Sequence, residues 1–317
     1  MKFINGVTFG FMNKRGEWDT AESYDSLKLL KERTGANTVI LAVVAEQDKP
    51  WSTEIHYQDD WNLSDDEVVK MIRYAQSLGL QVILKPMVNV SDGAWRAYIN
   101  FFDHDVPVEP TWHDWFVNYN AYILHYADMA QKTGCEMLVI GCELVNADRR
   151  DSDWRALIAK VRTHYKGLIT YNCDKFQEDN LTWWDAVDVI SSSGYYSVAI
   201  WEEQLNRIEK VVQKYEKPFF FCEVGCASRT GSEFLPNDWQ FDGETNLESQ
   251  ATFYKTMFAA CEKRDWVGGF GIWDWKAHIY DIKAATIDND YAIYGKPAER
   301  IIKENFAKRL GEVPYDE

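Results

Sequence analysis

The sequence of 317 residues predicts an α/β fold, a single (β/α)8 barrel of the TIM type over residues 1–310. Short apolar runs alternate with amphipathic stretches along the chain, which is the pattern of a parallel sheet covered by helices. No GxGxxG or GKS/T phosphate-binding loop favours an open nucleotide-binding sheet, and no linker divides the chain. Residues 311–317 are expected to form a C-terminal tail.

The eight predicted strands are apolar runs rich in β-branched residues. They comprise residues 3–9, 37–44, 81–88, 137–143, 168–173, 187–195, 218–224 and 268–273. Helices are predicted between them. One begins with a capping box, in which Ser64 and Glu67 each bond the other's backbone amide, and Gly79 is its stop signal. The other predicted helices comprise residues 24–34, 115–133, 152–165, 201–215 and 246–263.

Charge and hydropathy exclude several classes of partner. The chain has 34 basic and 50 acidic residues and a net charge of −16, so it repels nucleic acid and anionic membrane surfaces. No stretch approaches the roughly 20 apolar residues that span a bilayer. We therefore expect neither a nucleic-acid nor a membrane partner. The opening MKFINGVTFG lacks the apolar core of a secretion signal, so a cytoplasmic location is expected unless a signal has been removed.

Cysteine and histidine spacing predicts no metal site and no other cofactor. The six Cys form no CxxC pair, and the six His show no HxH or HExxH spacing. Aromatic residues are abundant instead, with 14 Trp and 17 Tyr. Aromatic rings stack on the apolar faces of pyranose sugars, and their polar tips bond sugar hydroxyls. Some of these residues must fill the core, but several are predicted to line a sugar-binding cleft.

Two glutamates are the predicted catalytic residues. Glu143 and Glu223 each follow an apolar run at the C-terminal end of a predicted strand, the fourth and the seventh. Those strands lie on opposite sides of an eight-stranded barrel, and barrel active sites are built at the C-terminal strand ends. A facing pair suits a retaining glycosidase, which needs two carboxyls about 5–5.5 Å apart. Alternatively, each belongs to a structural ion pair. Strand alternation predicts that the preceding Cys142 and Cys222 point outward to the helices.

Other strand ends supply candidate substrate-binding residues. Lys85 is expected to bond sugar hydroxyls or to offset the local negative charge, Asn172 to bind a hydroxyl, and Tyr195 to donate a hydrogen bond to the nucleophile. Trp273 is expected to form the floor of the sugar site, whereas Trp275 fits outer packing equally well. The full set of predicted binding residues is Lys85, Asn89, Asn172, Tyr195, Tyr196, Trp273 and Trp275.

These motifs resemble glycoside hydrolase family 113, which comprises β-mannanases and related β-mannosidases. The similar stretches are residues 64–67, 77–80, 84–86, 141–144, 221–225 and 271–275, spread over nearly the whole chain. The resemblance implies a retaining reaction on β-1,4-mannosidic linkages. It also implies that Glu143 is the acid/base and Glu223 the nucleophile.

Two departures from the related pattern leave the sugar open. Many members of this clan have Asn before the strand-four Glu, where it binds the 2-hydroxyl; here the residue is Cys142. Asn172 and Lys85 are the candidates for that contact. Relatives often have His after the Lys-Pro of strand three, where this chain has Met87. Because mannose differs from glucose at C2, both departures touch the contact that distinguishes these sugars.

Several alternatives remain at this stage. A relative in the same clan would act on β-xylo-, galacto- or gluco-oligosaccharides. A non-catalytic sugar-binding barrel would not need two facing acids, and a metal-dependent hydrolase would need ligands that the spacing does not supply. Endo or exo action depends on whether long segments such as 89–114 and 228–245 block the cleft. The sequence does not indicate which oligomeric state the protein adopts.

Overall fold

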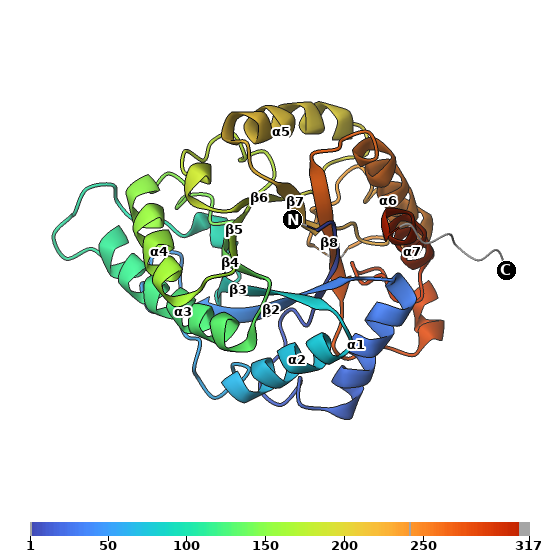
Figure 1. Cartoon of the computed structure of the whole chain (residues 1–317), viewed down its shortest axis with the longest axis horizontal. Coiled ribbons are helices and arrows are strands. Elements are labelled where there is room, and N and C mark those ends of the chain that lie inside the picture. Colours follow the sequence, from blue (N-terminus) through green and yellow to red (C-terminus); the bar gives the residue numbers. More distant parts are fainter. Residues whose placement is uncertain (1, 241, 311–317) are drawn as a thin grey trace.

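A computed structural model describes residues 2–240 and 242–310 of the chain. Its eight strands pair in sequence order, each parallel to the next, and β8 pairs with β1 to close the barrel. Figure 1 looks along this barrel, with the strands as a central ring and the helices around it. The predicted (β/α)8 barrel is confirmed, while the expected tail at 311–317 lies outside the described residues.

Every predicted strand and helix has an observed counterpart. The strands are β1 (Ile4–Phe9), β2 (Thr38–Gln47), β3 (Gln81–Val90), β4 (Met137–Cys142), β5 (Leu168–Cys173), β6 (Val189–Ser193), β7 (Phe219–Val224) and β8 (Val267–Trp275). The helices are α1 (Ala21–Thr34), α2 (Asp65–Ser77), α3 (Trp112–Thr133), α4 (Asp151–His164), α5 (Trp201–Tyr215), α6 (Leu247–Cys261) and α7 (Pro297–Leu310). The 3-10 turns are η1 (Arg96–Tyr98), η2 (Trp184–Ala186) and η3 (Ile282–Thr286).

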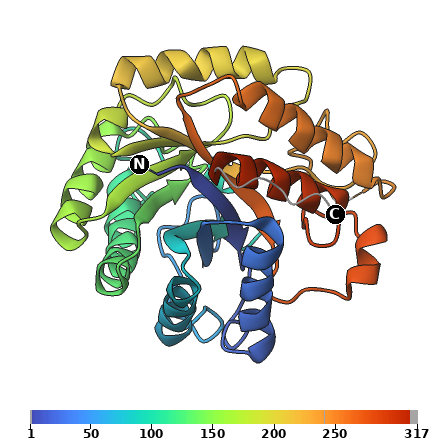
Figure 2. The same cartoon turned by 45° about the vertical axis from the view of Figure 1, so that its right-hand side comes forward.

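Local signals explain where the helices begin and which one the sequence analysis missed. The capping box at the start of α2 forms as predicted, with Ser64 and Glu67 bonded reciprocally. Helix α7 was not predicted; it begins with Pro297, a favoured first helical residue, and packs beside α6, as Figure 2 shows. Between β5 and β6 the described chain makes only the short turn η2. None of the described helices is long and apolar enough to cross a membrane.

Three apolar clusters form the core, and one of them, which includes Met87, Tyr195 and Trp273, lies at the barrel mouth. The largest cluster lies between strands and helices and holds most of the tryptophans, so the expected role of tryptophans in the core is confirmed for the majority of them. A smaller cluster fills the barrel itself. Its members come from β1, β2, β3, β4, β6 and β7: Ile4, Ile40, Ile83, Met137, Val139, Val189, Phe220 and Cys222. Because this cluster fills the barrel interior, a site can form only at the C-terminal ends of the strands.

Candidate active site

A pocket of about 420 Å³ opens at the C-terminal ends of the strands. This volume lies within the usual range for small-molecule sites. Both predicted catalytic residues, Glu143 and Glu223, line it, and so do Lys85's strand neighbours Met87 and Asn89. Aromatic side chains complete the wall. They are Phe11, Trp95, Trp239 and Trp273.

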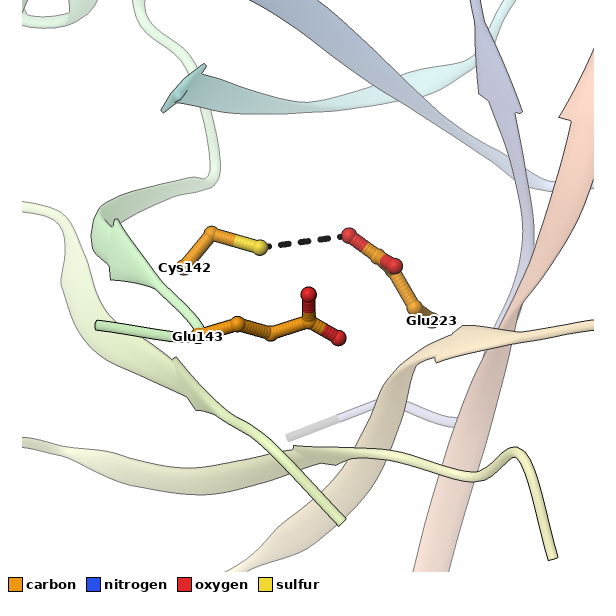
Figure 3. A group of neighbouring side chains, drawn as sticks. All are labelled: Cys142, Glu143 and Glu223. Carbon is orange, nitrogen blue, oxygen red and sulfur yellow. Dashed lines mark hydrogen bonds between the residues drawn. The ribbon is translucent and has the colours of Figure 1, made fainter. Parts of the chain in front are cut away.

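The two glutamates face each other across the barrel mouth (Figure 3). A carboxylate oxygen of Glu143, one of Glu223 and the sulfur of Cys142 all lie within 4.8 Å of one another. Both carboxylates are buried, with 7% and 3% of their surface exposed. The short separation suits direct attack by one carboxylate and is below the roughly 6.5–9.5 Å of inverting enzymes, which leave room for a water.

A bulge in β4 turns two consecutive residues into the pocket. Val139 pairs with Thr170 of β5, whereas Cys142 pairs with Asn172, so β4 uses three steps where β5 uses two. Glu143 then adopts a positive φ of 52°. The prediction that Cys142 points outward is therefore wrong: its thiol donates a hydrogen bond to Glu223 Oε1 at 3.3 Å. Bulges of this kind concentrate beside active sites, where they redirect a side chain.

β7 contains a similar bulge. Phe221 pairs with Ser192 of β6 and Glu223 pairs with Ser193, so Cys222 is the extra residue. Its side chain joins the apolar cluster inside the barrel instead of pointing to the helices, which corrects the second cysteine prediction. With Cys222 inside, Glu223 still reaches the pocket because the bulge breaks strict alternation.

Three side chains contact the carboxylate of Glu223, namely Lys85, Cys142 and Tyr195. The ammonium of Lys85, fully buried, forms an ion pair with Oε1, and the hydroxyl of Tyr195 donates to Oε2 at 3.0 Å. Burial alone would raise the pKa of Glu223, but the charges of Lys85 and then Arg96 outweigh it and lower that pKa below its ordinary value. Burial raises the pKa of Cys142 and of Tyr195, so both stay protonated donors at neutral pH. Glu223 is thereby held ionised.

A different set of donors holds Glu143. Arg96 donates from Nη1 to Oε2 at 2.9 Å, Trp95 from Nε1 to the same oxygen at 3.4 Å, and Ser193 from Oγ to Oε1 at 2.7 Å. Arg96 is itself fixed by Asn89, whose amide oxygen accepts its Nη2 at 2.6 Å. Asn89, predicted to bind substrate, thus lines the pocket and also orients Arg96.

A chain of hydrogen bonds links the surroundings of the two glutamates. Lys85 donates to Asn172 Oδ1 at 2.7 Å, and Asn172 Nδ2 donates to Ser193 Oγ at 2.9 Å. Ser193 in turn donates to Glu143. Asn172 is fully buried within this chain, so the structure places it as a support for Lys85 and not against a sugar hydroxyl.

Two predicted binding residues point away from the barrel mouth, toward the helices. Tyr196 packs in the outer core and donates its hydroxyl to the buried Glu178. Trp275 is also in the outer core, where its indole N–H donates to Ser26 Oγ at 3.0 Å. Both assignments to the sugar site are corrected, because each side chain faces the helices. Trp273, on the same strand as Trp275, does line the pocket as predicted.

Several residues of the site were not predicted from the sequence. Arg96 and Trp95 lie within the long segment 89–114, which was predicted only as a segment able to block the cleft. Ser193 comes from the end of β6. A strand-end polar residue was a usable signal for Ser193, whereas no local pattern distinguishes one arginine in a loop from another.

The three residues Cys142, Glu143 and Glu223 are also close enough to surround a metal ion. However, Lys85 and Arg96 already bind the two carboxylates. Since these cations balance the negative charge that would attract a metal, the arrangement suits proton and nucleophile chemistry better than metal binding.

Comparisons with known proteins agree with this geometry. The sequence model of Glycoside Hydrolase Family 113 matches residues 7–296. A GH113 β-1,4-mannanase complex is 54% identical, covers 96% of this chain and 99% of its own, and superposes with a TM-score of 0.95. The GH113 β-mannanase of Alicyclobacillus acidocaldarius in complex with ManMIm is 42% identical, with 98% of both chains covered and a TM-score of 0.94.

More distant structures share the fold alone. A β-D-glucuronidase from Dictyoglomus thermophilum is 16% identical, with a TM-score of 0.63 over 99% of this chain and 51% of its own. No curated protein sequence matched the chain.

Proposed function

Because the chain belongs to glycoside hydrolase family 113, we propose that it hydrolyses β-1,4-mannosidic linkages in mannan or manno-oligosaccharides with retention of the anomeric configuration. The observation that carries this proposal is the facing pair of buried glutamates, one surrounded by Lys85 and Tyr195 and the other by Arg96. The sugar is supported by two relatives that are β-mannanases and cover nearly the whole chain.

The reaction uses the two glutamates in turn. Glu223 attacks the anomeric carbon to form a glycosyl ester, while Glu143 gives a proton to the departing glycosidic oxygen. Glu143 then takes a proton from water, which attacks the same carbon and releases Glu223. Glu223 needs to be ionised for the first step, which its lowered pKa provides. The N–H donors of Arg96 and Trp95 stabilise the carboxylate that Glu143 becomes after it gives up its proton.

A second cavity supports cleavage within a chain of sugars. It has a volume of about 240 Å³ and shares Glu143, Trp95 and Trp239 with the main pocket. Lys175 and Asn237 line it, whereas Glu223 does not. The acid/base thus stands between two spaces, one beside the nucleophile for the glycon sugars and one for the leaving group. Room on both sides of the bond supports an endo-acting enzyme.

The test combines variants with a substrate panel. Mannotriose through mannohexaose are compared with the matching xylo- and cello-oligosaccharides, with timed product analysis and the anomer of the first product measured by NMR. We expect E223A to abolish turnover and E143A to retain the first step on aryl mannosides with good leaving groups, with azide rescuing the second. E109A, which changes an exposed glutamate outside the pocket, is the control. Wild-type activity in E223A, or an inverted first product, contradicts the proposal.

A further inference from the structure

The pocket contains one carboxylate that the catalytic machinery does not use. Glu46, near the end of β2, lines the pocket. The two catalytic carboxylates each have a cationic partner, Lys85 for Glu223 and Arg96 for Glu143. In contrast, across residues 2–240 and 242–310 no side chain forms an ion pair or hydrogen bond with the carboxylate of Glu46. Its acceptors are therefore available to a ligand.

Strand register explains why Glu46 faces the pocket. In the β2–β3 pair, Glu46 lies opposite Asn89 and Val44 lies opposite Met87. Residues opposite each other in neighbouring strands point to the same side of the sheet. Met87 and Asn89 both line the pocket, so Glu46 lies beside Asn89 on the same wall. The side chain is half-buried, which strengthens a hydrogen bond made there.

The position of Glu46 also identifies the sugar that it meets. The main pocket contains Glu46 together with Glu223 and Trp273, and none of these three lines the second cavity. A nucleophile contacts the anomeric carbon of the sugar that stays on the enzyme. A sugar that contacts Glu46 therefore belongs to the glycon side of the bond.

An ionised carboxylate accepts hydrogen bonds and cannot donate them. Sugar hydroxyls supply the donors it needs, and bonds to a charged acceptor are about twice as strong as neutral ones. Acetylation of a hydroxyl replaces the O–H donor with an ester, and it also adds bulk on the pocket wall. The chemistry of Glu46 thus favours sugars with free hydroxyls.

We propose that Glu46 is a specificity-determining residue that accepts hydrogen bonds from free hydroxyls of a glycon-side mannosyl unit, and so selects unsubstituted manno-oligosaccharides over acetylated ones. The proposal rests on the proposed β-mannoside hydrolysis for the name of the sugar. The hydrogen-bond argument itself requires only a neutral sugar with free hydroxyls in this pocket.

The experiment compares wild-type protein with E46A, E46Q and the control E54Q, which changes an exposed glutamate on the loop after the same strand. The substrates are mannotetraose and mannotetraose acetylated at its 2- and 3-hydroxyls. We expect E46A to lower kcat/KM for mannotetraose by about ten- to hundredfold, the value of one charge-assisted bond. E46Q keeps a neutral acceptor and is expected to lose less. The acetylated substrate should lose much less in E46A, and E54Q should match the wild type.

An unchanged kcat/KM in both E46A and E46Q overturns the proposal, and so does an equal loss on free and acetylated mannotetraose. Calorimetric binding of mannotetraose to E223A and to the double variant E46A/E223A reports the same contact without turnover, so the comparison does not depend on the reaction. If wild-type protein cleaves cellotetraose or xylotetraose instead of mannotetraose, the proposed sugar is wrong. The same variants then test Glu46 on that tetraose.

Discussion

Replacing Lys85 with methionine removes the cation that neutralises the carboxylate of Glu223 while keeping a side chain of similar length. Lys85 is fully buried, ion-paired with Glu223 and hydrogen-bonded to Asn172 at 2.7 Å. In K85M the carboxylate of Glu223 stays buried, and the nearest remaining cation, Arg96, is already paired with Glu143. The variant therefore isolates the effect of an uncompensated buried charge.

The expected size follows from the burial of both partners. Removing one member of a buried ion pair costs about 3–5 kcal/mol, because the other charge is left without a partner. The loss depends on pH. In the wild type the pKa of Glu223 is lowered, so its favourable contribution to stability is complete above the unfolded pKa of about 4.3 and is lost as pH falls through the lower folded value.

In K85M the charge of Lys85 no longer offsets the effect of burial on the pKa of Glu223. This pKa therefore rises above its wild-type value. Acid then protonates Glu223 and removes the uncompensated charge. The stability difference between wild type and K85M should be largest at about pH 7 and should shrink toward about pH 4, as the carboxyl of Glu223 passes through its titration range.

Urea denaturation at the two pH values measures this difference, and the pH profile of kcat/KM measures the ionisation of Glu223 directly. The acidic limb of any residual K85M activity should move to higher pH. K255M is the control, because Lys255 pairs with Glu248 on the surface. A stability deficit of the same size at both pH values, or an acidic limb that does not move, would refute the reasoning.

Three further results follow from named contacts. Y195F should lower kcat/KM by roughly ten- to hundredfold and should also destabilise the protein by about 1–3 kcal/mol, because the buried carboxylate of Glu223 loses one donor; an unchanged kcat/KM in folded Y195F would argue for a purely structural role. The acidic limb of wild-type kcat/KM should lie below about pH 4.3, since the pKa of Glu223 is lowered; a limb above that value contradicts the ion pair. S26A should destabilise the protein by about 1–3 kcal/mol, because the buried indole N–H of Trp275 loses its acceptor, and kcat/KM should not change. Reduced turnover in folded S26A would return Trp275 to the sugar site.

The barrel and its facing pair of glutamates were predictable because they depend on local patterns. Apolar runs define strands, and the C-terminal ends of parallel strands meet at one face. The sequence alone therefore places Glu143 and Glu223 in the barrel mouth. Tyr195 and Lys85 were predictable for the same reason, although only the structure shows that Lys85 binds Glu223.

The direction of individual side chains was less predictable. Simple alternation sent Cys142 outward, but a bulge in β4 returns it to the pocket, and bulges depend on pairing with the neighbouring strand. Tyr196 and Trp275 show the reverse case, since they are aromatic residues at strand ends that face the helices. Arg96 comes from a turn in a long loop, and its position is determined by Asn89, far from any periodic pattern.

The hydrogen bonds from Lys85 to Glu143 all have the same direction. Lys85 donates to Asn172, Asn172 to Ser193, and Ser193 to Glu143. Aligned donors polarise one another, so a change at one end is felt at the other. In the proposed reaction Glu223 becomes an ester, which removes the counter-charge of Lys85, so the field of Lys85 then acts more fully along this line. The stronger donation to Glu143 then favours the ionised form of its carboxyl, which is the form that the second step of the proposed reaction requires.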